Sequence, residues 1–364
     1  MKITCTTEHL QDAVLTTERF IGRHITLAIL SHLLFKASDR KITINATNLE
    51  MGIEYTVPGK IIKTGVVAVP AKLLSQILQS LPDETVTLEA KTHQLILHTP
   101  SSDITLHGAN PEDFPSLPII HPEFEFTINA TLFTEAIQQV IPAIAASTVK
   151  PELTGILISA SPHTLTFAAT DSFRLAEKTL NGLDGVLGAA ECIVPARALQ
   201  ELLRTVTPGA ELKVAVGEHQ IVFTWNETRI LSRLIDGSYP PYRTIIPKGY
   251  ESTIVVARAE LIQKIRLAAV FSSRLNDVTL TFSPTELSVA TTNAESGDST
   301  ARLAAKGRGA AGSVMFNYRY LSDGIEAAGG ENAALHLNGV TGAALIQNPN
   351  DTSFSYFLMP IRSV

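Results

Sequence analysis

One stretch of the sequence has the residue types of a phosphate-binding loop. Residues 307–312 read GRGAAG, which matches the G-x-G-x-x-G spacing of turns that hold a pyrophosphate at a helix N-terminus. That chemistry requires a parallel βαβ unit around the glycines. Here they lie between a polar strand-like stretch and a second short one, SVMFN, so we expect a hairpin loop instead.

Other reactive side chains give little support to catalysis. The ten histidines, such as His9, His93 and His219, lack the spacing of metal ligands, and the sequence has no phosphate-loop, zinc-protease or nucleophile-elbow motif. Asp171 could act as an acid or a base, but its place in a Thr-Asp turn favours a turn-capping role. We therefore predict a protein that is not an enzyme and that needs no metal or cofactor.

The end of the chain, YFLMPIRSV at 356–364, gathers apolar side chains where a terminus usually frays. Two interpretations stay open from the residues alone. The segment could be a last edge strand folded into a core. Alternatively, Met359 and Pro360 could line an apolar groove, because a thioether side chain adapts to varied partners.

Composition limits the classes of protein that fit. A chain of 364 residues with 45% hydrophobic content predicts two or three domains, and a formal charge of -6 disfavours a protein that binds nucleic acid over its whole surface. Cys5 and Cys192 lack metal-ligand spacing, so we expect buried thiols in a reducing compartment. Without a signal-peptide stretch or a long apolar run, the sequence predicts a soluble, cytoplasmic protein.

Three landmarks recur along the chain with one period. Thr47, Thr170 and Thr292 each follow an alternating strand and begin a Thr-Asn or Thr-Asp turn, and they lie 123 and 122 residues apart. An early helix is predicted in each copy, within HLQDAVLTTERFI, LFTEAIQQVIPAI and ELIQKIRLAAVF. A later amphipathic helix is predicted at 69–82, 194–208 and 316–329. Its apolar stripe consists of Leu74, Ile77, Leu78 and Leu81, then Leu199, Leu202, Leu203 and Val206, then Leu321, Gly324, Ile325 and Ala328.

Pro-rich junctions at 110–122 and 236–247 separate the copies. We predict domains at 1–118, 126–244 and 245–364, each an α+β unit in which two helices pack on antiparallel sheets. The two helices of a copy would lie side by side on one face of a sheet. Three copies would then present six helices on one continuous surface.

The ordered motifs of the whole chain resemble those of the beta subunit of bacterial DNA polymerase III, the sliding clamp family. They are DFPSLP at 113–118, ELTGILI at 152–158, ATDSFRLA at 169–176, SRLIDGSYPPYRTIIP at 232–247 and YFLMPIR at 356–362. The resemblance implies a DNA clamp fold in which two chains of three domains form a ring around duplex DNA. It implies a processivity factor that tethers the replicative polymerase.

In this family, partner proteins insert a short linear peptide into a groove between the second domain, the third domain and the C-terminal tail. The resemblance therefore favours the binding interpretation of the tail. The groove residues that it implies are Leu153, Thr170, Ser172, Phe173, Arg174, Leu175, Pro240, Ile245, Phe357, Met359, Pro360, Ile361 and Arg362. Two departures affect the expected depth and preferred peptide of the groove: Ser172-Phe173 stands where some members carry Gly-His, and Ser363-Val364 extends past the usual end.

A ring that slides needs a few cations near DNA and no base reading. Candidates are Arg23, Lys72, Lys150, Arg197, Arg204, Lys264 and Arg266, with Arg19 and Arg319 also on predicted helices. For each of them, an ordinary solvated helix face is the alternative. The resemblance implies that ring closure brings Ile104 and Leu106 of an edge strand against Val270 and Phe271 of a second chain, unless these four residues fill their own cores.

The resemblance also implies the partners: double-stranded DNA, the replicative polymerase, a clamp loader that opens the ring with ATP, repair proteins with short linear motifs, and a second copy of the chain. No membrane partner is expected. Two other functions stay open from the residues alone. One is a nucleotide-dependent enzyme that uses GRGAAG, and the other is a three-repeat scaffold that binds proteins but not DNA.

Overall fold

The computed structural model describes residues 1–22 and 27–361. The chain forms two compact units, one made of Met1–Thr131 and Arg197–Leu234, the other of Leu132–Ala196 and Ile235–Val364. Each unit therefore combines elements from two of the sequence repeats. Nowhere in the described ranges is a helix both long enough and apolar enough to cross a membrane.

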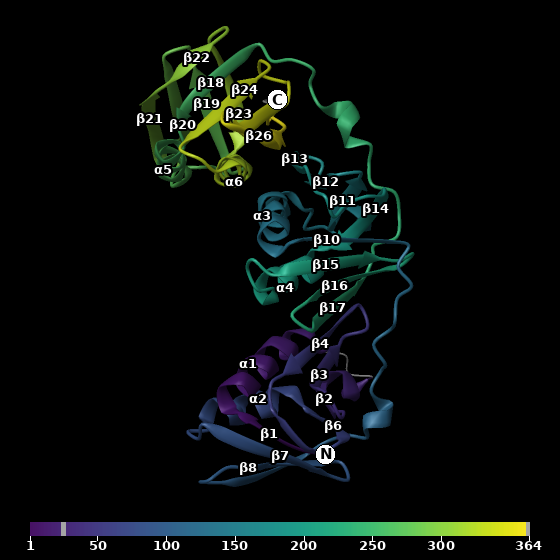
Figure 1. Ribbon diagram of the computed structural model, residues 1–364. Coiled ribbons are helices and arrows are strands. Elements are labelled where there is room, and N and C mark those ends of the chain that lie inside the picture. Colours follow the sequence, from purple (N-terminus) through teal and green to yellow (C-terminus); the bar gives the residue numbers. More distant parts are fainter. Residues whose placement is uncertain (23–26, 362–364) are drawn as a thin grey trace. The chain divides into compact units, whose positions relative to one another are not determined.

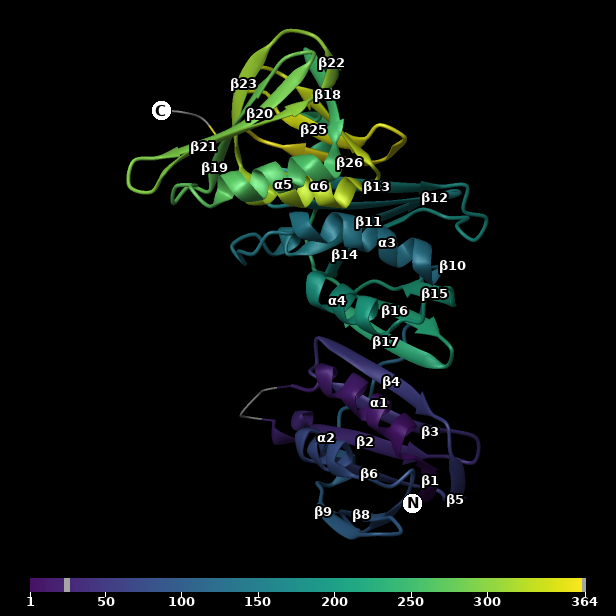
Figure 2. The same cartoon turned by 90° about the vertical axis from the view of Figure 1, so that its left-hand side faces the viewer.

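The helices expected from the repeats are present. The early helices are α1 (Thr7–Thr17), α3 (Ala130–Val140) and α5 (Arg258–Ala269), and the later ones are α2 (Ala71–Ser80), α4 (Ala196–Thr205) and α6 (Tyr318–Ala328). Capping side chains mark the starts of α1 and α6, since the Thr6 hydroxyl accepts from His9 N and the Asn317 side chain accepts from Arg319 N. The apolar stripes face inward, and α1 lies beside α2 as α5 lies beside α6 (Figures 1 and 2).

The first unit contains, within its described residues, a five-stranded and an eight-stranded antiparallel sheet. The smaller sheet has the order β5 (Lys60–Lys63), β1 (Lys2–Thr6), β7 (Thr85–Lys91), β8 (Gln94–His98) and β9 (Asp103–His107). The larger has the order β10 (Phe124–Asn129), β15 (Glu211–Val216), β16 (Gln220–Trp225), β17 (Thr228–Arg233), β4 (Met51–Val57), β3 (Ile42–Thr47), β2 (His32–Ala37) and β6 (Gly65–Pro70). Pairing of β17 with β4 joins the second repeat to the first, with Leu231 opposite Gly52.

The second unit contains, within its described part, a nine-stranded and a four-stranded antiparallel sheet. The larger has the order β14 (Ala190–Pro195), β11 (Gly155–Ser161), β12 (Thr164–Thr170), β13 (Arg174–Asn181), β26 (Asp351–Leu358), β25 (Ala344–Asn348), β24 (Asn332–Leu337), β18 (Ser252–Ala257) and β22 (Lys306–Arg308). The smaller has the order β21 (Gly297–Ala304), β20 (Glu286–Asn293), β19 (Asp277–Phe282) and β23 (Gly312–Asn317).

The last strand is not an edge strand. β26 pairs with β13 on one side and with β25 on the other, with Phe357 opposite both Leu175 and Leu345. The edge-strand interpretation of the C-terminal segment is therefore wrong, because both edges of β26 are occupied. The strand instead joins the third repeat to the second.

The GRGAAG segment is not a hairpin loop. β22 pairs with β18 in the nine-stranded sheet, whereas β23 pairs with β19 in the four-stranded sheet, so the segment crosses between two sheets. Gly309 has φ +101°, and a Cβ there would lie 2.2 Å from the Glu251 carbonyl oxygen. Close backbone packing explains the glycine at this position. A phosphate-binding loop would lead into a helix, whereas here strand β23 follows the segment.

The two cysteines lie in the core, as expected from their residue type. Both are buried and carry free thiols. Burial raises the pKa of Cys5 to about 11 and that of Cys192 to about 12. Both thiols are therefore held in the neutral form.

Candidate functional site

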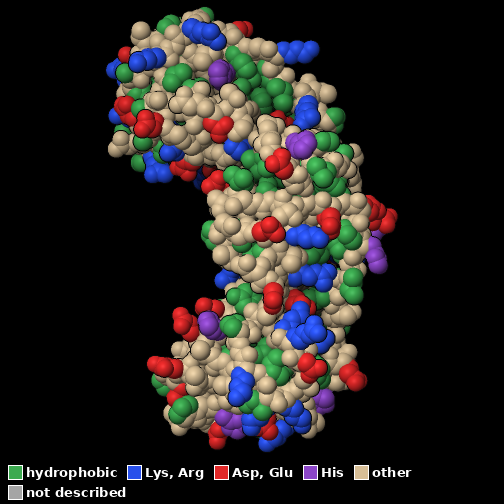
Figure 3. Space-filling model, viewed as in Figure 1, with side chains coloured by type: hydrophobic (Ala, Val, Ile, Leu, Met, Phe, Trp, Pro, Cys, Tyr) green, Lys and Arg blue, Asp and Glu red, His purple; other side chains and the backbone are tan. Residues whose placement is uncertain are grey.

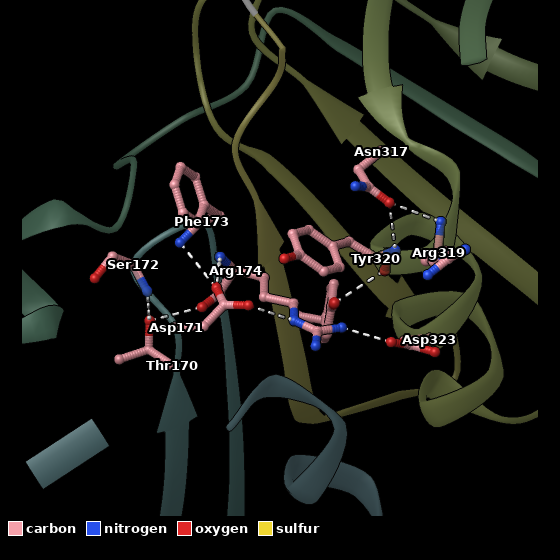
Figure 4. A network of polar contacts seen from close by, with 10 residues as sticks. Thr170, Asp171, Ser172, Phe173, Arg174, Asn317, Arg319, Tyr320 and Asp323 are labelled. Atoms are coloured by element: carbon pink, nitrogen blue, oxygen red, sulfur yellow. Dashed lines mark hydrogen bonds and ion pairs between the residues drawn. The ribbon is translucent and has the colours of Figure 1, made fainter. Parts of the chain in front are cut away.

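The turn between β12 and β13 is built from the Thr-Asp pair of the second repeat. The Thr170 hydroxyl accepts from Ser172 N at 3.1 Å and donates to the Arg174 carbonyl oxygen at 2.6 Å. Asp171 Oδ1 accepts from Phe173 N at 2.9 Å and from Arg174 N at 3.0 Å (Figure 4). The predicted turn-capping role of Asp171 is confirmed, and it fixes the backbone of residues 172–174.

The first repeat uses the same turn. Asn48 Oδ1 accepts from Glu50 N at 3.0 Å and from Met51 N at 2.8 Å. Leu49 and Ser172, at equivalent positions, both have positive φ angles, 75° and 78°. In the third repeat strand β20 continues one residue past Thr292, and the Asn293 side chain accepts from Glu295 N at 2.9 Å.

Arg174 ties this turn to helix α6. Its Nε lies 2.9 Å from Asp171 Oδ2, its Nη1 lies 2.5 Å from Asp323 Oδ2, and its guanidinium stacks 4.0 Å from the centre of the Tyr320 ring. Burial alone would lower the pKa of Arg174, but Tyr356, Asp323 and Asp171 outweigh it and raise the pKa above its ordinary value. The guanidinium is thus charged and fully engaged with groups of the protein.

A cavity of about 330 Å³ opens beside this turn. Eight of the predicted groove residues line it: Thr170, Ser172, Phe173, Arg174, Leu175, Ile245, Phe357 and Met359. Four residues that sequence reasoning missed complete the lining: Ile246, Pro247, Ala343 and Leu358. Ile246, Pro247 and Leu358 adjoin predicted residues within the quoted motifs, whereas Ala343 is brought in only by the pairing of β25 with β26.

The other predicted groove residues lie elsewhere. Leu153 is buried in the core cluster beneath the cavity, together with Leu175 and Phe357. Pro240 precedes the short 3₁₀ helix Tyr242–Ile245, whose last residue reaches the cavity wall. Ile361 lines a different cavity of about 410 Å³, Pro360 lines neither of these two, and Arg362 falls outside the described residues.

Two backbone hydrogen bonds hold the C-terminal segment against the site. Met359 N donates to the Phe173 carbonyl oxygen at 2.9 Å, and Ile361 N donates to the Met315 carbonyl oxygen at 2.8 Å. Around the cavity mouth, Phe173 is 62%, Ile245 70% and Met359 39% exposed. Figure 3 shows hydrophobic side chains gathered near the C-terminus. An exposed apolar rim of this kind typically marks an interaction site.

A tyrosine anchors the linker that forms the opposite wall. The Tyr242 hydroxyl donates to the Glu177 carboxylate on β13, and Arg243 Nε lies 3.5 Å from the same carboxylate oxygen. Burial and the neighbouring Glu177 raise the pKa of Tyr242. The Tyr242 ring packs edge-on against Tyr239 in the cluster beneath the cavity. Because Tyr242 is held in place, the position of Ile245 at the end of the same 3₁₀ helix is also fixed.

Most of the predicted DNA-facing cations are exposed. Lys72, Lys150, Arg197, Arg204 and Arg266 are exposed, and Lys264 is half-buried. Two of these cations pair with carboxylates, Arg204 with Glu201 and Arg266 with Glu326, each at 2.9 Å. Arg23 lies outside the described residues. On the face drawn in Figure 3, cationic and anionic side chains intermingle.

The predicted dimer residues differ in exposure. Ile104 and Leu106 lie on β9, which pairs with β8 at the edge of its sheet, and Leu106 is buried. Val270, just after α5, is 71% exposed, while Phe271 is half-buried. Val270 thus has apolar surface available for a partner, whereas Leu106 contributes to its own core.

Models of three protein-family domains match the chain in order. The N-terminal domain of the DNA polymerase III beta subunit matches residues 1–118, the central domain 127–241 and the C-terminal domain 243–362. The chain belongs to the DNA polymerase III beta subunit family. The resemblance found in the sequence is therefore confirmed, together with a fold of three clamp domains.

Full-length relatives agree with this beta-subunit assignment. The beta sliding clamp of Synechococcus elongatus is 27% identical, covering 100% of this chain and 99% of the relative, and that of Bacillus subtilis is 26% identical, covering 100% of both. The crystal structure of the B. subtilis DNA polymerase sliding clamp has a TM-score of 0.96 at 25% identity, and a Pseudomonas aeruginosa sliding clamp bound to griselimycin has 0.95 at 25%. Each structure covers 100% of both chains. This beta-subunit family member is thus a sliding-clamp subunit.

Proposed function

We propose that two copies of this chain close into a ring around duplex DNA and tether the replicative polymerase and repair proteins through the apolar groove. The observation that carries the proposal is the ordered match of three beta-subunit domains along the whole chain. It supports a clamp over a repeat scaffold that never binds DNA. Within the ring we assign the domains to 1–118, 126–244 and 245–364.

The groove is proposed to take a short linear peptide. Leu175, Phe357 and Leu358 form a buried apolar floor, and Ile245 and Met359 form exposed walls. Such a groove suits a peptide in which a few apolar anchors supply most of the binding energy. Leu153 supports the floor from below, and we keep Pro240, Pro360, Ile361 and Arg362 as proposed groove residues, of which Arg362 lies outside the described residues.

Ring closure is supported by the way the repeats already pair. In the first unit, β17, the last strand of the second repeat, pairs with β4 of the first repeat. In the second unit, β26, the last strand of the third repeat, pairs with β13 of the second repeat in the same way. The corresponding strands β9 and β21 are left at sheet edges. We propose that β9 of one chain pairs with β21 of a second chain, with Ile104, Leu106, Val270 and Phe271 beside the junction.

DNA contact is proposed to be electrostatic and independent of base sequence. Lys72, Lys150, Arg197, Arg204, Lys264 and Arg266 are the candidates, together with Arg23. Few and partly paired cations suit a ring that must slide, since strong phosphate neutralisation would hold it in place. The chain itself would carry out no chemistry and would work in the bacterial cytoplasm, where a clamp loader would open the ring with ATP.

A retention assay on plasmid DNA tests this function. The purified chain should sediment as a dimer, remain on a nicked circular plasmid after loading by a clamp loader, and leave when the plasmid is cut once. Ile245→Asp should still be retained but should no longer stimulate the polymerase, because the charge occupies the groove wall. A chain that sediments as a monomer and also leaves uncut circles would overturn the proposal.

A further inference from the structure

Strand β10 has an outer edge that no other strand covers in the described part of the chain. It ends the eight-stranded sheet and pairs with β15 (Figures 1 and 2). Ala130 N, directly after the strand, donates to the Ala210 carbonyl oxygen in line with this ladder. Every second residue counted back from Ala130 therefore points its backbone groups toward β15, while those of Glu125 and Thr127 point to the open edge. Both residues are exposed.

The same edge is covered in the other two repeats. The strands β1, β10 and β18 each lead directly into the early helix of their repeat. Ile3, Phe126 and Ile254 all lie four residues before the start of that helix, so they are equivalent, and all three are buried. Strand β5 pairs with the outer edge of β1, and β22 pairs with that of β18. The repeat pattern thus places one more strand beside β10 than the second repeat supplies.

The second repeat uses the corresponding segment differently. The equivalent of β5 and β22 is the connection between β13 and β14. There, Leu183 N donates to the His163 carbonyl oxygen at 3.0 Å, and His163 N donates to the Val186 carbonyl oxygen at 2.7 Å. The connection is therefore bonded to the turn between β11 and β12 and forms no strand.

The two covering strands share a charge pattern. Each has an apolar or small residue opposite the buried position and a cation on either side. The cations are Lys60 and Lys63 in β5, and Lys306 and Arg308 in β22. In the first and third repeats, one cation lies opposite Lys2 or Thr253, and the equivalent residue of the second repeat is Glu125. A strand of the same pattern beside β10 would thus place a cation opposite a carboxylate, which stabilises strand pairing.

Glu125 can accept a second cation. Lys213 of β15 approaches its Oε2 atom at 3.0 Å, and the two side chains are 53% and 49% exposed. An exposed ion pair of this kind contributes little free energy, so it does not fix the carboxylate. The Oε1 atom can pair with a cation that arrives from the open edge.

We propose that the outer edge of β10 is a docking site for an extended basic segment of a partner protein. The segment adds to the sheet as a strand whose backbone pairs with Glu125 and Thr127. An apolar or small residue of the segment lies beside Phe126, and a Lys or Arg lies opposite Glu125. The site is separate from the apolar groove, whose described lining residues all lie outside β10.

Amide hydrogen exchange of the full chain tests this docking. The probe is a pentapeptide, Thr-Lys-Ile-Lys-Thr, blocked at both ends. In the free chain the amides of Glu125 and Thr127 should exchange rapidly, and the probe at about ten times its dissociation constant should slow them about 10-fold. The amides of Lys2 and Thr4 already face β5, so they should be protected without the probe and unchanged by it. Unchanged exchange at Glu125 and Thr127 would overturn the proposal.

Two altered probes separate strand addition from charge attraction. One replaces both lysines by glutamate, and the other keeps the lysines but carries methyl groups on their backbone nitrogens. Each should slow exchange less than about 2-fold, because the first reverses the charge and the second cannot donate to the edge. Equal slowing by the glutamate probe would refute the selection of a basic segment, and equal slowing by the methylated probe would refute strand pairing.

Variants of the chain locate the site. Glu125→Lys should weaken binding of the basic probe about 5-fold, because like charges then face each other. Thr127→Pro should abolish binding, since it removes an N–H group that points to the open edge and not to β15. Glu211→Lys is the matched control, because Glu211 is exposed on β15 opposite Asn129, and it should bind as the wild type does. Ile245→Asp should also bind normally, and loss of binding there would place the probe in the groove instead.

Melting temperatures check that the variants are folded. Glu125→Lys and Glu211→Lys should melt within a few degrees of the wild type, because both side chains are exposed. Unweakened binding to Glu125→Lys would contradict the proposed site even if Thr127→Pro failed to fold. Sedimentation decides the kind of occupant: association beyond the dimer that Glu125→Lys abolishes would make the occupant a second copy of the chain, and the partner protein would be wrong.

Discussion

At the residue scale, the Asp171 carboxylate links local backbone to distant structure. One oxygen accepts from two backbone N–H groups of its own turn, and the other pairs with Arg174, which also pairs with Asp323. The Asp171 and Arg174 side chains are both largely buried. Loss of either partner would leave a buried charge without its counterion, which costs far more than loss of an exposed ion pair.

Asp171→Ala should therefore destabilise the protein by about 3 kcal/mol and weaken peptide binding, because both the turn caps and the ion pair are lost. Asn48→Ala is the matched control: it removes the same two turn caps in the first repeat, where no ion pair is attached. It should cost about 1–2 kcal/mol and leave peptide affinity unchanged. Urea denaturation and calorimetry measure both, and equal effects of the two variants would contradict the role assigned to the ion pair.

The Thr-Asp turn and the ion pair between Arg174 and Asp323 were not equally predictable from the sequence. The Thr-Asp pair identifies a turn because a short side chain next to its own backbone can bond only locally. Asp323 gives no such signal: it lies 149 residues from Arg174, on a helix whose sequence predicts only a buried stripe. Contacts of this kind depend on which strands pair, and that information is not present in either segment alone.

The buried thiols predict a loss of stability in alkali. The pKa of Cys5 rises from 9.0 to about 11 and that of Cys192 from 9.0 to about 12, because burial disfavours the thiolate. The neutral thiols contribute their full stability below pH 9, and this stability is lost as the pH rises through 9 toward the folded values. Denaturation curves measured at a series of pH values give the free energy of unfolding at each pH. Replacing each cysteine by Ser should remove its part of the alkaline loss.

At the element scale, the sheets show where the repeat pattern stops being informative. The period predicts six helices and similar strands in each copy, and these are present in the described residues. It does not predict that β26 would lie between β13 and β25, or that residues 307–312 would cross between sheets. Alternating residues reveal a strand and its buried face, whereas a neighbour from another repeat is chosen by long-range backbone pairing.

The linker wall depends on one hydrogen bond. Tyr242→Phe removes the bond to Glu177 that anchors the 3₁₀ helix Tyr242–Ile245, while the ring keeps its packing against Tyr239. A hydrogen bond to a charged group contributes about 1.5–3 kcal/mol. Only part of this free energy serves to hold Ile245 in the groove wall, so we expect peptide affinity to fall about 5-fold.

Thr244→Ala is the control within the same short helix, because the Thr244 hydroxyl bonds, among the residues that the structure describes, only to the Pro241 carbonyl oxygen. The peptide affinity of Thr244→Ala should stay within about 2-fold of that of the wild type, because a surface substitution that breaks no buried contact has a small effect. The double variant Tyr242→Phe with Glu177→Gln should bind no more weakly than Tyr242→Phe alone. Additive losses in the double variant would show that the two side chains do not act as one tether.

At the scale of the whole molecule, DNA contact should reveal itself through salt. Lys72→Ala and Arg197→Ala each remove an exposed cation from a helix. If both touch phosphates, the slope of log affinity against log salt for duplex DNA should decrease by about 0.9 for each. Lys213→Ala, on β15 and paired with Glu125, is the control and should leave the slope unchanged.

Dimer closure gives the most demanding prediction. Each junction between repeats uses the same pair of strand positions, and in the described part of the chain β9 and β21 are the pair at these positions whose outer edges stay unpaired. Val270 lies just after α5, which packs beside β21, and exposes most of its side chain. A charge at this position would be desolvated in a dimer but hydrated in a monomer, so Val270→Asp should shift the equilibrium toward the monomer without lowering the melting temperature of the isolated chain.

Ile119→Asp is the matched control, because Ile119 is also mostly exposed, at 83%, but lies in the linker before β10. Sedimentation at falling concentration should show a dimer at least about 10-fold weaker for Val270→Asp, which is the loss expected for one desolvated charge. The dimer of Ile119→Asp should be unchanged. Retention on circular DNA should fall in parallel, because topological holding requires both junctions of the ring to stay closed. If Val270→Asp remained a stable dimer and stayed on circles, the β9–β21 junction would be wrong even though the chain is a clamp.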